Sequence, residues 1–209
     1  MIGRLCRQAR PLRTRTDAAA AVEFAIILPV LIMLTLGIID GSIMFFKWTT
    51  IGQSSRDGVR AVAEQPGDDY SDYSGLKAAG LVFAAVPEGD IERLVIYKAT
   101  TDYDGDNNPL NNKPPAVCLT GTSGVANVCN VYSGSDLKAN RAAYAAGTKH
   151  LYWPGINRDL WADSNDTDYI GVYVAARVRP PTGVLGGERI LSQFTVARIE
   201  PQATNPPLS

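Results

Sequence analysis

The chain has 209 residues, of which 45% are hydrophobic, and its 20 Lys or Arg nearly balance 21 Asp or Glu to give a net charge of −1. This composition is ordinary for a folded protein. The charge is unevenly distributed, because the first sixteen residues carry +5 whereas residues 48–209 hold 14 Lys or Arg against 18 Asp or Glu. A mildly acidic C-terminal part gives no electrostatic reason for nucleic-acid binding, so we expect no nucleic acid among the partners.

A basic leader precedes a long apolar run. The leader, residues 1–18, contains five arginines, and the run from Ala18 to Phe46 has only two charged residues, Glu23 and Asp40. A helix of about 20 apolar residues crosses a bilayer core that is roughly 30 Å thick. Because arginines favour the cytoplasmic side of a membrane, we expect a single-pass protein of the inner or cytoplasmic membrane. Its N-terminus is expected to be cytoplasmic and its C-terminal domain extracytoplasmic.

The predicted helix continues beyond the membrane. It covers residues 19–64, and its transmembrane part extends to about Phe46. Past Lys47, side chains that can be buried recur at spacings of three and four, which indicates an amphipathic helix. These residues are Trp48, Ile51, Ser55, Val59 and Val62. Pro66 and Gly67 end the helix.

An α+β domain is predicted over residues 65–200, followed by a loose tail at 201–209. Its elements are a helix from about Ser74 to Val86, a strand at Ile91–Ala99, and an antiparallel hairpin made of Ile170–Val178 and Leu191–Ile199. Alternating apolar residues and the Pro and Gly residues between the last two strands support the hairpin. One face of the first strand is expected to carry Ile91, Val95 and Tyr97, and the other Leu94 and Ile96.

Residues 100–168 form a loop region that is rich in Asp, Asn, Gly and Pro. Within it Cys118 and Cys129 are eleven positions apart, which in an oxidising compartment predicts a disulfide. Two buried thiols are the alternative. Four aromatic residues are expected to hold the remainder of the region on the sheet: Tyr144, Tyr152, Trp153 and Trp161. The predicted fold is thus a long transmembrane helix followed by an extracytoplasmic domain with an antiparallel sheet and a disulfide-stapled loop region.

One segment of this loop region is a candidate metal site. Asp102, Asp104 and Asp106 place carboxylates at alternate positions, as calcium loops do. The Gly and Glu that an EF-hand needs are replaced by Asn107 and Lys113, so an EF-hand is rejected. A looser calcium site and a solvated Asx-rich turn remain as two interpretations.

Sequence signatures of enzymes are absent from the chain. Its single histidine, His150, lies in no recognisable nucleophile signature. The sequence also contains no glycine-rich phosphate loop and no cluster of zinc ligands. We therefore expect a protein that is not an enzyme and that has no cofactor.

Three segments of the N-terminal helix carry a family resemblance. Ala19–Pro29 contains Glu-Phe followed by an apolar run and a proline, and the pattern continues through Gly37–Gly41 to Ser54–Ala61. These segments resemble the TadE-like pilins of tight-adherence (Tad/Flp) pilus systems. The resemblance covers about residues 18–62, and Asp57 stands where the family usually has Glu.

The resemblance implies a type IV-like prepilin that a membrane prepilin peptidase cleaves between Ala18 and Ala19. Cleavage there would make Glu23 the fifth residue of the mature chain. Ala18 departs from the Gly that the family usually has before the cut, although it is also small. The implied partners are the prepilin peptidase, other pilin subunits, the pilus assembly platform and membrane lipid.

Glu23 is costly in lipid, and its position therefore suggests a role. With Phe24 beside it, Glu23 would pair with the terminal amine of a neighbouring subunit and set the register of packed helices. The alternative is that its carboxylate only reaches the nearby headgroups. Pro29 would loosen the helix or kink it harmlessly, and Gly37 and Gly41 would permit close helix packing.

Three functional hypotheses follow, of which an anchored enzyme is the one that the missing signatures disfavour most. The first is a TadE-like minor pilin or pseudopilin, which helps to assemble, prime or cap a tight-adherence type IV pilus and so serves cell adhesion. The second is a membrane-anchored surface adhesin that is not incorporated in a pilus. A mature N-terminus at Ala19 would favour the first, and an uncleaved Met1 would favour the second.

Overall fold

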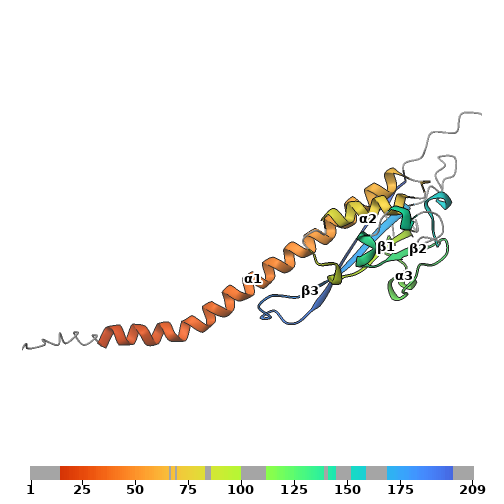
Figure 1. The fold of residues 1–209 in the computed structure, drawn as a ribbon. Helices are drawn as coiled ribbons and strands as arrows, with labels where there is room; N and C mark the ends of the chain where they lie inside the picture. Colours follow the sequence, from red (N-terminus) through yellow and green to blue (C-terminus); the bar gives the residue numbers. More distant parts are fainter. Residues whose placement is uncertain are drawn as a thin grey trace, which may run out of the picture.

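A computed structural model describes residues 15–65, 67–68, 70–82, 86–99, 112–138, 141–144, 152–158 and 169–199 (Figure 1). The fold is α+β, as predicted. One long helix carries at its C-terminal end a domain with a four-stranded sheet. The helices and strands are α1 (Arg15–Glu64), α2 (Ser71–Val82), β1 (Ile91–Ala99), α3 (Ala116–Thr120), β2 (Cys129–Tyr132), β3 (Tyr169–Val178) and β4 (Arg189–Arg198). Single 3₁₀ turns are η2 (Glu88–Asp90), η3 (Gly134–Lys138), η4 (Arg141–Tyr144) and η5 (Gly155–Asn157).

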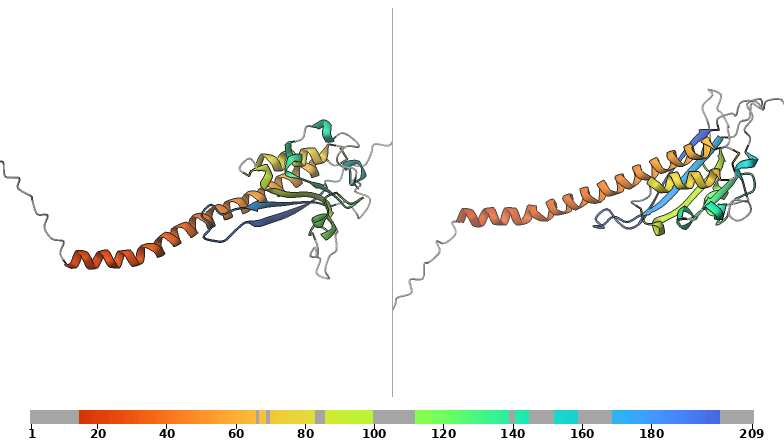
Figure 2. Two further views of the ribbon diagram at one scale, coloured as in Figure 1. Left: turned by 60° about the horizontal axis from the view of Figure 1, so that its bottom comes forward. Right: turned by 45° about the horizontal axis from the view of Figure 1, so that its top comes forward.

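Helix α1 is 50 residues long and passes through Pro29 without interruption. Its N-terminal half projects away from the domain along a gentle curve, whereas its C-terminal half lies on the sheet beside α2 (Figure 2). The helix ends just before Gly67, which has a φ of 82° that glycine adopts without steric cost. Helix α2 runs from Ser71 to Val82, so it starts three residues before the predicted start at Ser74. Residues 83–85, which the prediction included, lie outside the described part of the chain.

The sheet has the order β2-β1-β3-β4, and every neighbouring pair is antiparallel. The predicted hairpin is present as β3 and β4, which pair from Tyr169↔Arg198 to Val178↔Arg189. Strand β2 and helix α3 were not predicted. They have only four and five residues, which is too short for a periodic pattern to show.

Strand β1 was predicted at its observed bounds, but the assignment of Ile91 to a face was wrong. The register with β3 shifts between Ile91 and Arg93, which marks a β-bulge. The extra residue turns Ile91 to the face of Leu94 and Ile96, away from Val95. A simple period of two cannot reveal such a shift.

Two cores lie on opposite faces of the sheet. The larger core fills the space between the sheet and the helices α1 and α2, and includes Ile51, Val62, Leu76 and Val172. The smaller core lies under α3 and contains Val95, Tyr97, Ala99, Cys118 and Cys129. The C-terminal half of α1 is therefore part of the larger core, and it cannot move independently of the sheet without exposing that core.

Candidate functional site

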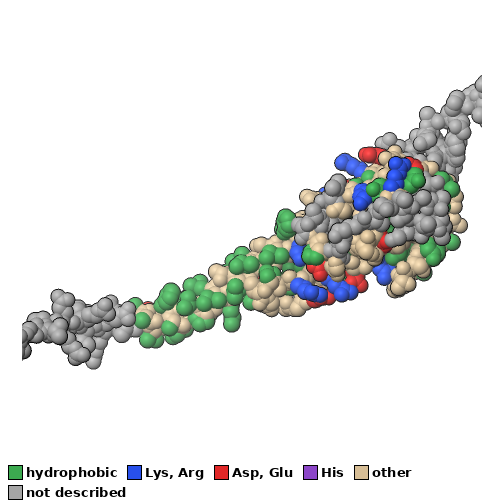
Figure 3. All heavy atoms as spheres, viewed as in Figure 1, with side chains coloured by type: hydrophobic (Ala, Val, Ile, Leu, Met, Phe, Trp, Pro, Cys, Tyr) green, Lys and Arg blue, Asp and Glu red, His purple; other side chains and the backbone are tan. Residues whose placement is uncertain are grey.

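The N-terminal half of α1 has an exposed apolar surface. Side chains from Ala19 to Ile39 are mostly exposed, among them Ile26 at 70% and Met33 at 67%. The hydrophobic side chains cover this part of the helix in Figure 3, in which the charged side chains gather on the domain. By length and composition Ala19–Glu64 contains a candidate membrane span, and none of the apolar window is buried against the rest of the protein. This finding is consistent with a single-pass membrane protein.

Glu23 and Phe24 lie on this exposed surface. Phe24 is 58% exposed, and Glu23 is exposed without an ion pair or hydrogen bond to any residue that the structure describes. Ala19 is exposed one turn away. Nothing in the described part of the chain neutralises the Glu23 carboxylate, so a group from outside that part is needed if it enters an apolar environment.

The two predicted packing glycines have different surroundings. A methyl group placed on Gly37 would meet no atom within 4 Å, so this site is open to another helix. A methyl group on Gly41 would lie 3.8 Å from Leu185 Cδ1. Gly41 thus faces the protein's own β3–β4 loop. Of these two glycines, only Gly37 keeps its small surface free of contacts with other described residues.

Asp40 is fully buried by the loop between β3 and β4. Its Oδ1 accepts a hydrogen bond from the Thr182 amide at 2.9 Å, and its Oδ2 accepts one from the Thr182 hydroxyl at 2.6 Å. The amides of Val184 and Leu185 also donate to Oδ2, at 3.1 and 3.4 Å. The sequence analysis assigned no role to Asp40, although an acidic residue in an apolar run was a visible signal. Its partners are 142 to 145 residues away in the chain.

The segment Arg56–Arg60 has one inward and one outward face. Val59 is buried in the larger core, and a methyl group on Gly58 would be 3.4 Å from the Gly75 carbonyl oxygen and from Ala79 Cβ. The charged side chains of Arg56, Asp57 and Arg60 are exposed. The small and apolar residues of the segment therefore serve the fold, whereas its charged residues face outward.

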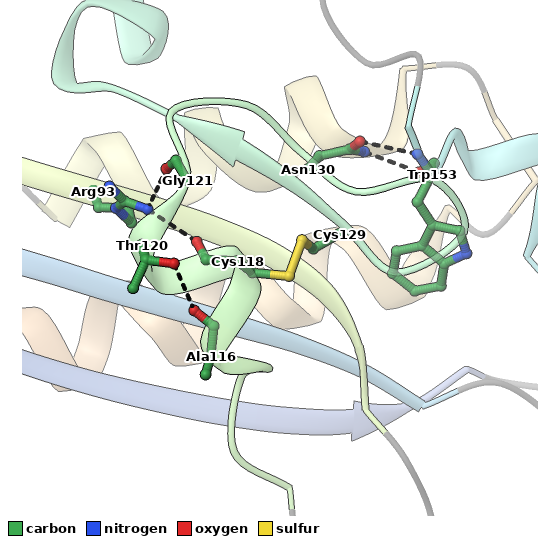
Figure 4. The surroundings of a disulfide bond; sticks show 8 residues. All are labelled: Arg93, Ala116, Cys118, Thr120, Gly121, Cys129, Asn130 and Trp153. Atoms are coloured by element: carbon green, nitrogen blue, oxygen red, sulfur yellow. Dashed lines mark hydrogen bonds between the residues drawn. A yellow bond between two sulfur atoms is a disulfide. The ribbon is translucent and has the colours of Figure 1, made fainter.

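The predicted disulfide between Cys118 and Cys129 is present. It joins α3 to β2, with 6.4 Å between the two Cα atoms, and both residues are fully buried. Figure 4 shows Arg93 beside it, donating to the carbonyl oxygens of Cys118 at 3.0 Å and Gly121 at 2.6 Å. These bonds and the disulfide hold α3 against the sheet.

A buried polar network was not predicted. The Asp72 carboxylate forms an ion pair with Arg158 and accepts hydrogen bonds from Asn130 at 2.7 Å and from the Tyr132 hydroxyl at 2.6 Å. Asn130 also exchanges two hydrogen bonds with the backbone of Trp153, drawn in Figure 4. The network joins α2, β2 and the segment 152–158. It could not be found from sequence because its members are ordinary polar residues far apart in the chain.

The charge state of Asp72 follows from these partners. Burial by itself raises the pKa of a carboxyl group, but the charge of Arg158 and the hydrogen bonds from Tyr132, Arg158 and Asn130 outweigh burial and hold the pKa of Asp72 below its ordinary value. Burial, together with the Asp72 charge, raises the pKa of Tyr132. Asp72 is therefore ionised and Tyr132 neutral at physiological pH.

The predictions for the four aromatic residues of the loop region differ in their outcome. Tyr144 and Trp153 are almost fully buried in the larger core, as predicted. Tyr152 is 40% exposed, and its carbonyl oxygen accepts a hydrogen bond from the Asn127 amide at 2.7 Å. Its ring lies so close to Gly124 that a methyl group on that glycine would be 2.7 Å from Tyr152 Cδ2. Trp161 lies outside the described residues.

Several predictions concern residues outside the described part of the chain. The calcium candidates Asp102, Asp104 and Asp106, His150, most of the basic leader and the tail at 201–209 lie there. They stay predictions. Among the described residues, no group of three or more His, Cys, Asp or Glu side chains is placed to hold a metal ion.

A comparison with known families gives a match within α1. Residues 18–60 match the family model described as TadE-like protein. Comparisons of the chain with curated proteins and with solved structures give no significant match. The matched residues comprise the exposed apolar surface, Asp40 and the segment Arg56–Arg60. The N-terminal helix of this protein is therefore a TadE-like segment, and that family indicates a protein associated with the tight-adherence pilus.

Proposed function

We propose that the protein is a TadE-like minor pilin that takes part in assembly, priming or capping of a tight-adherence pilus. The observation that carries this proposal is the position of the TadE-like segment, whose apolar N-terminal half is not covered by the protein's own domain. An apolar surface of this length needs lipid or other apolar helices around it. A pilin meets both surroundings in turn, first in the membrane and then in the pilus.

Glu23 supplies the specificity of helix packing in this proposal. After cleavage between Ala18 and Ala19, the new terminal amine would lie one turn from Glu23 of its own chain and could reach Glu23 of a neighbour. An unpaired charge in an apolar environment is costly, so only a register that pairs amine and carboxylate is favourable. Gly37, which is open on the helix surface, would allow a neighbouring helix to approach closely.

The outer domain would move as one body with its helix. Ile51, Val59 and Val62 of α1 are buried in the larger core, and Ser55 Oγ lies 2.8 Å from Thr195 Oγ1 of β4. Packing of the N-terminal half of α1 among other helices would thus fix the position of the domain at the pilus surface.

The first test is the mature N-terminus. We expect a mass consistent with a chain that starts at Ala19 when the protein is made together with its prepilin peptidase, and an intact leader when the peptidase is inactive. Ala18→Gly, the residue usual in the family, should be processed at least as fast. A protein that remains intact and works in surface binding would instead support the membrane-anchored adhesin.

The second test separates assembly from insertion. Glu23→Gln should insert into the membrane normally but enter pili with a more than roughly tenfold loss, because an amine left without its carboxylate is a buried unpaired charge. Ile26→Ala, at a residue that is also exposed about one turn along the same helix, is the matched control and should assemble. Equal pilus incorporation of both variants would contradict the register role of Glu23.

A further inference from the structure

The tip of the β3–β4 hairpin, residues 180–187, is uncharged and lies against α1. Its sequence is Pro-Pro-Thr-Gly-Val-Leu-Gly-Gly, and Val184 and Leu185 are 46% and 41% exposed. All three ribbon views show the hairpin lying along α1 and pointing toward the projecting N-terminal half (Figures 1 and 2). Among the described residues of the domain, the tip therefore reaches furthest along the apolar helix.

Asp40 fixes the position of the tip along the helix. The four hydrogen bonds from Thr182, Val184 and Leu185 satisfy the carboxylate, so this acidic residue does not face a lipid environment unpaired. Gly41 next to it faces the same loop, because a methyl group placed there would be in van der Waals contact with Leu185 Cδ1. The tip is thus in direct contact with the helix at residues 40–41.

The position of Asp40 along α1 coincides with the outer boundary that we expect for the hydrocarbon core of the membrane. The stretch from Ala19 to Ile39 has 21 residues, which at about 1.5 Å per residue span roughly 30 Å, the thickness of that core. Just beyond Asp40, Phe45, Phe46 and Trp48 are exposed on α1. Aromatic side chains in this position are typical of the membrane–water interface.

Charged residues lie next to the uncharged tip, where the hairpin joins the rest of the sheet. Arg179 pairs with Glu188 at 2.7 Å, Arg177 pairs with Glu92, and Arg189 donates to the Leu185 carbonyl oxygen at 3.2 Å. An apolar tip followed by charged residues suits the boundary between acyl chains and headgroups, because the ion pairs can stay in the polar headgroup layer while the tip enters the apolar layer.

We propose that this hairpin tip is a second membrane contact, in which Val184 and Leu185 enter the extracytoplasmic lipid boundary beside the transmembrane helix. Asp40 is the positioning residue that binds the tip to α1. The hydrocarbon-spanning part of the helix then ends at Ile39, earlier than the Phe46 expected from hydropathy. This inference rests on the membrane-spanning role of α1 that is part of the proposed function.

The test uses the full chain in vesicles of phosphatidylcholine and phosphatidylglycerol with brominated acyl chains. A polarity-sensitive fluorophore is attached to one introduced cysteine, Val184→Cys, in a Cys6→Ser background. A label at Ile32→Cys, in the middle of the span, is the positive control. A label at the exposed Ser123→Cys, in the loop after α3 on the sheet face away from α1, is the negative control. Because interfacial segments are buried about 5–10 Å into the boundary, we expect a roughly twofold quenching by bromine at 184, stronger quenching at 32 and none at 123.

The two control labels distinguish a failure of the proposed function from a failure of the present inference. No quenching at 32 would refute the membrane span and the proposed function with it. Quenching at 32 without quenching at 184 would overturn the present inference alone. A third outcome is a label at 184 that is insensitive to bromine but reports a less polar environment as the protein-to-lipid ratio rises. This outcome would place the tip against a second copy of the protein and would also overturn the inference.

A second variant tests the positioning role of Asp40. Asp40→Ala removes the acceptor for four hydrogen bonds but leaves the tip itself unchanged. We expect the quenching at 184 to decrease severalfold in this background while that at 32 stays the same. Unchanged quenching at 184, with the fold intact by circular dichroism, would show that Asp40 does not position the tip.

Discussion

Asp40 and Asp72 are two buried carboxylates that the protein stabilises in different ways. Asp40 receives only neutral donors, three of them backbone amides of one loop. Asp72 has the guanidinium of Arg158 and two neutral side chains. A buried charge is tolerated only where its hydrogen bonds are made. Each carboxylate consequently joins segments that are distant in the chain, and substitution at either should have effects beyond its own element.

We predict that Asp72→Asn lowers the free energy of unfolding by about 3–5 kcal/mol, since it leaves the Arg158 charge buried without its partner. Chemical unfolding of the full chain in detergent, followed by tryptophan fluorescence, measures this. The double variant Asp72→Asn/Arg158→Met should recover part of the loss, because it removes the orphaned charge. A double variant less stable than Asp72→Asn would contradict this account.

The lowered pKa of Asp72 also predicts a pH dependence. Because the folded pKa lies below the ordinary value of 3.8, the contribution of Asp72 to stability is fully present above that value and is lost as the pH falls through the lower folded pKa. Unfolding experiments at decreasing pH should therefore show a loss of stability in the acid range that is smaller in the double variant. Equal acid sensitivity of both proteins would rule out Asp72 as the source.

At the scale of elements, the packing of α1 on α2 depends on glycines that face each other. A methyl group on Gly75 would be 2.2 Å from Val62 Cγ2 and 3.1 Å from the Gly58 carbonyl oxygen. The Ser54 hydroxyl donates to the Ala79 carbonyl oxygen at 3.1 Å across the same contact. Small residues let the two helices approach closely, and Gly58 belongs to the TadE-like segment.

We predict that Gly75→Ala destabilises the protein by about 1–3 kcal/mol through overpacking, even though alanine favours a helix more than glycine does. Gly89→Ala is the matched control, because a methyl group there would meet nothing within 4 Å. Thermal unfolding of both variants measures the difference. Equal melting temperatures would show that Val62 can move aside without cost.

At the scale of the whole molecule, the domain consists of a sheet with a layer on each face. On one face, α1 and α2 form the larger core. On the other, α3 covers a smaller core of only a few side chains and is joined to β2 by the disulfide. A small core alone gives limited stability, which explains the need for a covalent link there.

We predict that replacing Cys118 and Cys129 together by Ser lowers the free energy of unfolding by about 3 kcal/mol, on chain-entropy grounds for a loop of this length. Membrane insertion should not change, because α1 is separate from this layer. Urea unfolding and membrane fractionation check the two statements. Two reactive thiols in the purified native wild-type domain would contradict the premise of a formed disulfide.

The sequence determined the elements whose patterns are long and regular. The apolar run predicted α1, apolar residues on both faces of Ile91–Ala99 predicted β1, and the alternation in Ile170–Val178 predicted β3. The spacing of Cys118 and Cys129 predicted the disulfide. Such patterns are local, because they record which face of one element is buried. The TadE-like residues were also visible, since they form a continuous segment.

Only the tertiary structure decided which distant residues meet. The bulge that turns Ile91, the contact between Gly58 and Gly75, and the pairing of Asp72 with Arg158 depend on how elements pack, which no local period records. The same is true of Asp40. In the sequence it is a charge within an apolar run, and in the fold it is the point at which the β3–β4 hairpin is bound to the helix.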